Sequence, residues 1–382
     1  MNKATAAPAY RAERVASLSE FLDRCDRLAE PGTLPFHRRC WLEAWYTTIG
    51  QSGGRSPVLL AVQGPAGDDV LLLPLVSVRW RGLSWLDYAD AGVVDYVAPL
   101  VAPHWAAGVP EDQAARALWQ ALRPALAGHD VLCLDKLLER GLPETGHRAN
   151  PLVLALPTAP SDLFGNQFAV DGDWEGWRRS LDKRVRKEIE RCWRVFHRSP
   201  EARFERITEP ARAAEFLATL ERQQSERLTP LLGERYKLDQ PPYRAFYRQA
   251  LQAGLAEGHV VLTVLLDGEH VVSALFGMSN GARYIGLRQS LGGDAWKQCS
   301  PGRLLDEQTA RHMHESGRQH FDFGVGEYFH KTTLQMAQIP LRTLCHALSW
   351  RGTLAVWAWR GKRWLKHQPR VMAAWRQMQA RR

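Results

Sequence analysis

The stretch His320-Phe-Asp-Phe-Gly-Val-Gly-Glu-Tyr-Phe-His-Lys331 is the most informative part of this sequence. Its first four residues, 320–323, predict a short strand that breaks into glycines and then into charged residues. Upstream lies Ser300-Pro-Gly-Arg-Leu-Leu305, followed by a helical pattern that ends at Gly317. The predicted order is therefore a turn, a helix, a strand and a polar strand end.

The turn before this helix is a candidate anion site. The first N–H groups of a helix have no partner within it, and anions bind there. Ser300 suits a helix cap, and the next residue, a proline, suits the first helical position. On spacing alone an ordinary capped helix is the better interpretation, whereas an acyl-CoA pyrophosphate also fits such a turn, because Gly302 offers no side chain to block its approach. We therefore predict the cofactor-binding residues Ser300, Gly302, Arg303 and Leu304.

The strand after the helix brings four candidate catalytic residues toward the same anion. Glu327 is the preferred base, because it follows the strand end and an attacking amine must lose a proton. Asp322 lies within the strand, where aspartate is disfavoured, so it needs a partner: a backbone turn, an arginine or the acceptor. Lys331 suits a thioester oxyanion or a phosphate. His330 is a further proton-transfer candidate.

These residues resemble the second domain of the CelD/BcsL-type acetyltransferases, a GNAT family linked to cellulose and exopolysaccharide production. The matching positions are Pro301, Gly302, Leu304, Phe321, Asp322, Phe323, Gly326, Glu327 and Lys331. His330 stands where that family usually has tyrosine. The full GNAT pyrophosphate loop is absent, and Arg288-Gln-Ser-Leu-Gly-Gly293 precedes the helix by too many residues to replace it. We expect its two glycines in a flexible loop over the acceptor.

Composition indicates a folded protein of two domains. The 382 residues are 45% hydrophobic and 24% charged, and no apolar run approaches the roughly 20 residues that span a bilayer. The first thirty residues lack an apolar signal region, so we expect a cytoplasmic protein. The six cysteines form no C-x-x-C pair, so we expect neither a metal nor a disulfide framework. Cys299, beside the anion turn, is a minor candidate nucleophile.

Positive charge is concentrated at the end of the chain. Residues 328–382 contain eleven Lys or Arg and no acid, so this segment accounts for the entire net charge of +9. We therefore expect no nucleic acid partner for the protein as a whole. Five tryptophans lie among these arginines. Residues 350–382 fit either a peripheral segment on an anionic membrane at its inner face or a final helix docked on the core.

Two similar halves are expected. The first half has predicted strands at 58–62, 70–78, 131–134 and 152–156 and a helix at 113–126, and the turn formers of 157–162 mark a boundary.

The second half begins with a predicted helix over 174–198. This helix has an apolar face for the core and a basic face, which is either solvated or binds an anion. A second helix is predicted at 211–227. Asp267-Gly268 and Asn280-Gly281 predict three antiparallel strands. Each half has a hairpin, a helix and a following strand, as an internal duplication would give.

The resemblance and the pattern together predict an α/β (α+β) fold of tandem GNAT-like domains, each a mixed, mainly antiparallel sheet flanked by helices. The expected domains are 1–160, a degenerate GNAT-like unit; 161–349, the acyltransferase; and the tail 350–382. The expected activity is acyl transfer from acetyl-CoA or another acyl-CoA to a small-molecule or saccharide acceptor. The alternatives are Fem-like aminoacyl transfer from tRNA and a non-catalytic assembly protein of a polysaccharide system.

Overall fold

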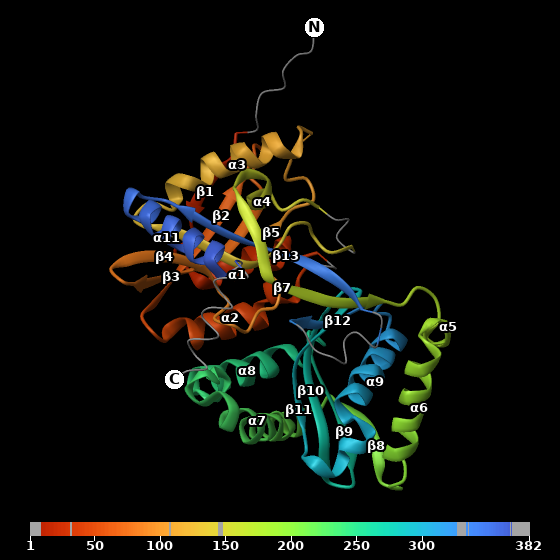
Figure 1. Cartoon of the computed structure of the whole chain (residues 1–382). Helices are drawn as coiled ribbons and strands as arrows, with labels where there is room; N and C mark the ends of the chain where they lie inside the picture. Colours follow the sequence, from red (N-terminus) through yellow and green to blue (C-terminus); the bar gives the residue numbers. More distant parts are fainter. Residues whose placement is uncertain are drawn as a thin grey trace.

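A computed structural model describes residues 9–30, 33–106, 108–143, 148–326, 334, 336–366 and 368. These residues form two lobes (Figure 1). The first lobe contains these elements: β1 (Arg11–Arg14), α1 (Leu18–Leu28), the 3-10 turn η1 (Pro35–His37), α2 (Arg39–Thr47), the 3-10 turn η2 (Ile49–Gln51), β2 (Arg55–Gln63), β3 (Asp69–Trp80), β4 (Leu83–Tyr88), β5 (Leu100–Val101), α3 (Glu111–Ala125), β6 (Val131–Leu138) and α4 (Pro151–Ala155).

The second lobe repeats this order of elements. It contains β8 (Ala202–Ile207), α7 (Pro210–Leu232), η4 (Gly233–Arg235), η5 (Lys237–Asp239), α8 (Pro241–Gly254), β9 (Val260–Asp267), β10 (His270–Asn280), β11 (Arg283–Leu291), η6 (Asp294–Cys299), α9 (Pro301–Glu315) and β12 (His320–Val325). In both lobes a strand, two helices and three antiparallel strands precede a helix and a parallel strand. The internal repeat that the sequence pattern indicates is present in the order of elements.

Two long strands join the lobes into one sheet. They are β7 (Thr158–Ala169) and β13 (Ala337–Ala347), and the strand order is β1-β2-β3-β4-β6-β13-β7-β12-β11-β10-β9-β8, with β5 beside β3. β13, from the end of the second lobe, pairs with β6 of the first, and β7 pairs with β12 of the second. The lobes thus exchange strands at the centre of the sheet (Figure 1). The predicted fold class, α+β with a mixed and mostly antiparallel sheet, is confirmed.

The hairpins of the second lobe form where the turn residues predict them. Gly268 and Gly281 have φ angles of +56° and +54°, a conformation that glycine adopts at no steric cost. Helices α7 and α8 cover one face of this sheet, and α9 covers the other. Helices α5 (Trp174–Ser180) and α6 (Lys183–Phe196) pack outside α9, with Ile189 and Phe196 buried. The core-packing interpretation of this amphipathic segment is confirmed.

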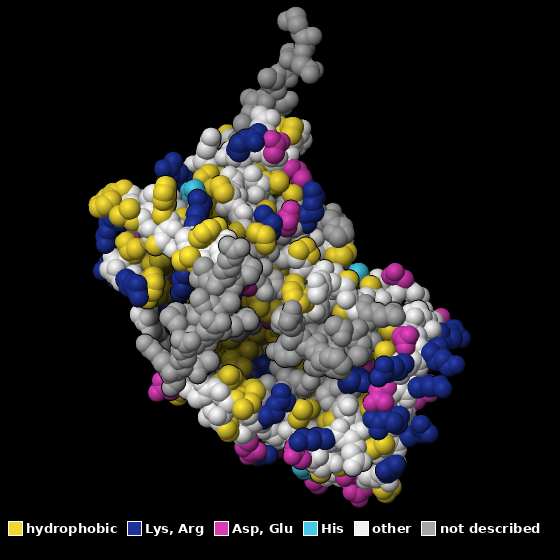
Figure 2. Space-filling model, in the orientation of Figure 1, with side chains coloured by type: hydrophobic (Ala, Val, Ile, Leu, Met, Phe, Trp, Pro, Cys, Tyr) yellow, Lys and Arg dark blue, Asp and Glu magenta, His cyan; other side chains and the backbone are white. Residues whose placement is uncertain are grey.

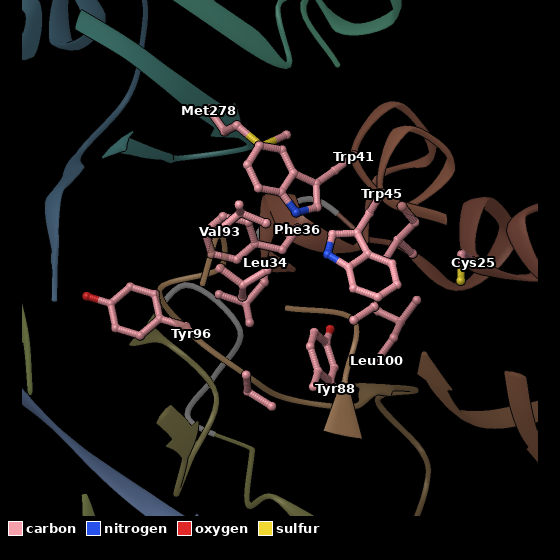
Figure 3. Packing of buried hydrophobic residues seen from close by; sticks show 14 of the residues in the cluster. Cys25, Leu34, Phe36, Trp41, Trp45, Tyr88, Val93, Tyr96, Leu100 and Met278 are labelled. Carbon is pink, nitrogen blue, oxygen red and sulfur yellow. The ribbon is translucent and has the colours of Figure 1, made fainter. Parts of the chain in front are cut away.

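The hydrophobic core is continuous between the lobes. One cluster of buried side chains extends from α1 and α2 to α8 and β10. Trp41 of α2 packs edge-on against Phe246 of α8, with ring centroids 4.7 Å apart. Figure 3 shows Trp41 close to Met278 of β10, and Tyr96 at the edge of the cluster with its hydroxyl pointing away from it. The two lobes therefore share buried apolar surface, which stabilises their association.

Three segments have a local structure that differs from the one expected from the sequence. Residues 152–156 are not a strand: Asn150 caps a short helix there, accepting from Leu152 N at 3.0 Å, and proline occupies its first position. The helix over 174–198 is two helices, because Asp182 starts a new one by accepting from Arg184 N at 2.7 Å. The turn formers of 157–162 lie largely in β7, where pairing with β13 overrides their local preference.

The last described helix, α11 (Trp350–Lys366), lies on the first lobe against β13 and β6. Val356 is buried there with Val131 and Cys345. Gly352 fits closely beneath Asp130, since a Cβ on it would lie 1.8 Å from the Asp130 carbonyl oxygen. This part of the tail is therefore docked on the core. None of the helices that the structure describes is long and apolar enough to cross a bilayer.

Candidate functional site

The turn that begins α9 has the expected position but an unexpected cap. Ser300 adopts the left-handed conformation, with φ 49° and ψ 59°, and its hydroxyl makes no capping bond to the helix. The predicted side-chain cap is therefore wrong. The Ser300 carbonyl instead accepts from Arg303 N at 3.0 Å and from Leu304 N at 3.2 Å. Pro301 has no N–H, and within the described residues the N–H of Gly302 has no hydrogen-bond partner. The turn thus retains a free donor at the positive end of the helix.

Gln289 of β11 holds this turn in place. Its Nε2 donates to the Gly302 carbonyl at 2.9 Å and to Asp306 Oδ1 at 2.7 Å. A Cβ at position 302 would lie 2.8 Å from Gln289 Oε1, so a side chain there would push the end of the Gln289 side chain aside. Sequence reasoning missed Gln289, because in the run 288–293 it interpreted only the two glycines, which it expected in a flexible loop. Residues 288–291 are the end of β11, and Gly292 continues the sheet by donating to the Val272 carbonyl at 2.9 Å.

The strands that flank α9 diverge at the end where the helix begins. β11 and β12 pair in parallel through residues 283–285 and 320–322. Beyond these residues β11 stays with β10 as far as Leu291, while β12 pairs with β7 on its other side at Val325. The carboxyl ends of the two parallel strands and the start of α9 therefore lie together, which is where α/β folds bind ligands. Figure 2 shows a hollow with hydrophobic side chains between the lobes.

In the first lobe, the corresponding position beside the carboxyl ends of β4 and β6 is filled. β4 and β6 pair in parallel at Trp85–Val131 and Leu86–Leu132. Val97 then fills the space beyond: its N–H donates to the Lys136 carbonyl, and its carbonyl accepts from Leu138 N, both at 2.9 Å. Helix α3 also begins with two acids, Glu111 and Asp112, which repel an anion at a helix N-terminus. Of the two lobes, the second therefore has the open strand ends and the acid-free helix start that an anionic ligand needs.

Asp322 is fully buried and has several partners. Tyr96 Oη of the first lobe donates to its Oδ2 at 2.5 Å, and Arg283 Nη1 lies 3.4 Å from the same oxygen. Its Oδ1 accepts from Gly324 N at 2.8 Å. The arginine and the backbone turn, which were two of the three partners considered for this carboxylate, are both present. We infer that Asp322 joins the lobes.

The remaining predicted residues have separate positions. Leu304 is completely buried in the second core cluster, so its side chain packs rather than contacts a ligand. Arg303 is half-buried beside α6. Glu327, His330 and Lys331 lie outside the described residues. Within those residues, no group of three or more His, Cys, Asp or Glu side chains could hold a metal.

Cys299 does not have the properties of a nucleophile. Its thiol is buried and donates to the Trp296 carbonyl at 3.1 Å. Burial raises the pKa of the Cys299 thiol to about 11, so the reactive thiolate is scarce at neutral pH.

A buried polar cluster lies on the opposite face of β11. Arg288 donates twice to Gln224 Oε1 of α7, at 3.0 and 2.6 Å, and stacks 4.3 Å from the ring of Tyr247. Glu221 of α7 lies 3.5 Å from Arg288 Nη1, and burial raises the pKa of its carboxyl. The sequence signal was available: Glu221 and Gln224 share the buried face of α7 with Leu217 and Leu220. The cluster fixes α7 on the strand that carries Gln289.

Comparisons with known proteins agree with this geometry. Residues 183–332 match the family model described as an acetyltransferase (GNAT) domain. This segment runs from α6 through β12, and its type suggests acyltransferase activity without defining the donor or the acceptor. No curated protein matches the sequence.

Solved structures resemble the chain over most of its length. FemX is 11% identical, with 87% of this chain and 96% of that chain covered and a TM-score of 0.57. The C-terminal domain of a putative lysylphosphatidylglycerol synthetase from Agrobacterium fabrum is 11% identical, with 89% and 96% covered and a TM-score of 0.53. L-PGS from Bacillus licheniformis is 12% identical, with 89% and 95% covered and a TM-score of 0.53. At these identities the likeness concerns the fold.

Proposed function

We propose that this protein is an acyl-CoA-dependent N- or O-acyltransferase whose second lobe carries the reaction. The observation that supports this most is the divergence of β11 and β12 at the start of α9, together with its absence from the first lobe. An extended pantetheine chain carries amides that can pair with the edge of a strand. The diverging part of β11 provides such an edge beside the anion-binding turn.

The donor would be held by the backbone more than by charged side chains. The free N–H of Gly302 and the positive end of α9 favour the pyrophosphate, and no acid lies in the first turn of the helix. Arg303 adds one positive charge to this turn. Acetyl-CoA is the donor we favour, because the resemblance to the CelD/BcsL-type acetyltransferases includes this turn.

The proposed chemistry is direct attack on the thioester. An amine or hydroxyl of the acceptor attacks the carbonyl carbon, forming a C–N or C–O bond, and the C–S bond breaks to release the CoA thiol. Glu327 takes the proton of the acceptor, and His330 is the second candidate for this step. Lys331 stabilises the oxyanion or binds a phosphate. We assign these roles from the sequence resemblance, and the three residues follow β12 in the sequence.

We propose a sugar or an exopolysaccharide-related compound as the acceptor, again from the resemblance. Fem-like aminoacyl transfer from tRNA is the second candidate, and the fold likeness to FemX supports it. The chain between β7 and β8 forms two helices of 7 and 14 residues, α5 and α6. It therefore lacks the long coiled-coil arm that we would expect between Fem-like lobes.

Donor binding separates the candidates. Calorimetry with acetyl-CoA and with CoA should show one site per chain, and a filter assay with charged tRNA should show no retention at physiological salt. Retention of tRNA without CoA binding would support the Fem-like candidate, and binding of neither would support a non-catalytic role. Incubation with labelled acetyl-CoA and a panel of amino sugars and saccharides would then identify the acceptor class.

A further inference from the structure

Helix α11 has two faces with opposite properties. One face is docked: Val356 packs on the first lobe, and Ser349, just before the helix, donates to Asp130 Oδ1 at 2.5 Å. Arg363 and Lys366 also reach Asp162 at the start of β7. The helix is thus fixed to the protein along its length.

The other face exposes large apolar side chains to solvent. The exposed fractions are 76% for Trp350, 67% for Leu354, 73% for Trp357, 63% for Trp364 and 46% for Leu365. Residues 350, 354, 357 and 364 recur at helical spacing, so they share one side. Isolated exposed apolar residues are ordinary, but an aligned row of them on one helix marks an interaction surface.

A second element adjoins this row. Arg351 Nη2 donates to the Gly82 carbonyl at 2.6 Å, which places the tip of the β3–β4 hairpin beside the start of α11. At this tip Trp80 is 54% exposed, and the Arg81 guanidinium lies 4.6 Å from the centre of its ring. Figure 2 shows hydrophobic side chains with Lys and Arg among them over this part of the first lobe.

The charged side chains of α11 itself all have one sign, and the acid that pairs with two of them, Asp162, lies on β7. Helix α11 carries Arg351, Arg360, Lys362, Arg363 and Lys366 and contains no acid. Tryptophan and basic residues together favour the headgroup layer of an anionic membrane, where the rings enter the interface and the cations meet phosphates. A protein partner would instead require a matching acidic and apolar surface. The charge complementarity therefore favours lipid.

We propose that the exposed face of α11, together with the tip of the β3–β4 hairpin, docks on an anionic lipid surface. The two interpretations of the tail given by the sequence, a membrane segment and a docked helix, are then both satisfied by different faces of one helix. Figure 1 shows that α11 lies on the first lobe and α9 in the second, so docking through α11 leaves the second lobe off the lipid-facing side of the helix. The inference concerns location and is independent of the proposed chemistry.

Vesicle sedimentation tests the proposal. The intact protein is mixed with vesicles of 30% phosphatidylglycerol in phosphatidylcholine, or of phosphatidylcholine alone, at low and high salt. We expect binding to the anionic vesicles that weakens at high salt. The double variant Arg360→Glu/Lys362→Glu should lower the partition coefficient by about 30-fold or more, because each basic residue near the leaflet contributes about fivefold. Leu354→Ser/Trp357→Ser should lower it by about 10- to 100-fold.

Matched controls are available in the second lobe. Leu231 of α7 is 75% exposed, so Leu231→Ser removes an equally exposed apolar side chain away from α11. Arg184→Glu/Lys187→Glu reverses two exposed charges on α6. Both controls should bind vesicles like the unmodified protein, and all variants should keep its melting temperature because the changed side chains are exposed.

Four outcomes would overturn the proposal. They are no binding to anionic vesicles, equal binding to phosphatidylcholine at high salt, an equal loss of binding in the controls, and a dimer of the unmodified protein that becomes a monomer in Leu354→Ser/Trp357→Ser. The last outcome would identify a second copy of this chain as the occupant.

Discussion

The link between Tyr96 and Asp322 should be structural, and its strength can be calculated. Tyr96→Phe removes a hydrogen bond to a buried carboxylate, which costs about 2 kcal/mol of unfolding free energy. Asp322→Asn leaves Arg283 buried without its anion and should cost about 3–5 kcal/mol. Because both changes break the same contact, the double variant should lose at least about 1 kcal/mol less than the sum of the two.

Urea denaturation of the three variants measures their unfolding free energies. Kinetics at saturating acyl-CoA then shows whether the turnover number falls together with the unfolding free energy. A Tyr96→Phe cost below about 0.5 kcal/mol would refute the inferred link between the lobes. If the Asp322→Asn protein kept its stability while its turnover fell by about 100-fold, Asp322 would instead have a catalytic role. Leu71→Ala, a core change in the first lobe away from this contact, provides a control for stability loss alone.

Three further predictions concern single positions. Alkylation of Cys299 should be slow at pH 8 and accelerate about tenfold per unit up to its pKa of about 11, and Cys299→Ala should keep full turnover; fast labelling at pH 7 would contradict the burial argument. Glu327→Gln should lower turnover by about 100-fold with donor affinity kept, and an unaltered rate across pH would make His330 the next candidate. Gly352→Ala should lower the melting temperature, because its Cβ would collide with the Asp130 carbonyl; an unchanged melt would show that α11 is not docked as described.

The sequence predicts the hairpins and the α9–β12 segment of the second lobe well because their signals are local, whereas it missed β8 and α8. Asp267-Gly268 and Asn280-Gly281 sit at hairpin turns whose glycines need positive φ angles, and the structure has both. The helix from Pro301 and the strand from His320 also lie where the pattern places them. Local turn chemistry and strand alternation do not depend on distant partners, so they can be recognised in one sequence.

Features that depend on contacts between distant parts of the chain could not be predicted from the sequence. The exchange of β7 and β13 between the lobes depends on pairing between segments nearly 180 residues apart in the sequence. No local pattern in Pro157-Thr-Ala-Pro-Ser-Asp162 predicts this pairing. In the first lobe, Val97 occupies the space beside β6 through backbone hydrogen bonds alone, and such bonds leave no pattern in the sequence. Gln289 was missed because its role appears only once β11 lies beside the start of α9. The candidate turn at Gly302 was found, whereas the residue that holds it was not.

Calorimetry of acetyl-CoA on two matched variants tests the central claim most directly. Arg303→Glu places an acid at the third position of α9, and Gln113→Glu does so at the third position of α3 in the first lobe. An acid at a partly buried helix N-terminus opposes an anion by about 1–2 kcal/mol, and loss of the Arg303 charge adds to this. We predict that Arg303→Glu weakens acetyl-CoA binding by about 30-fold while Gln113→Glu leaves it unchanged. Equal affinity in Arg303→Glu, or a loss in Gln113→Glu instead, would contradict a donor site at the start of α9.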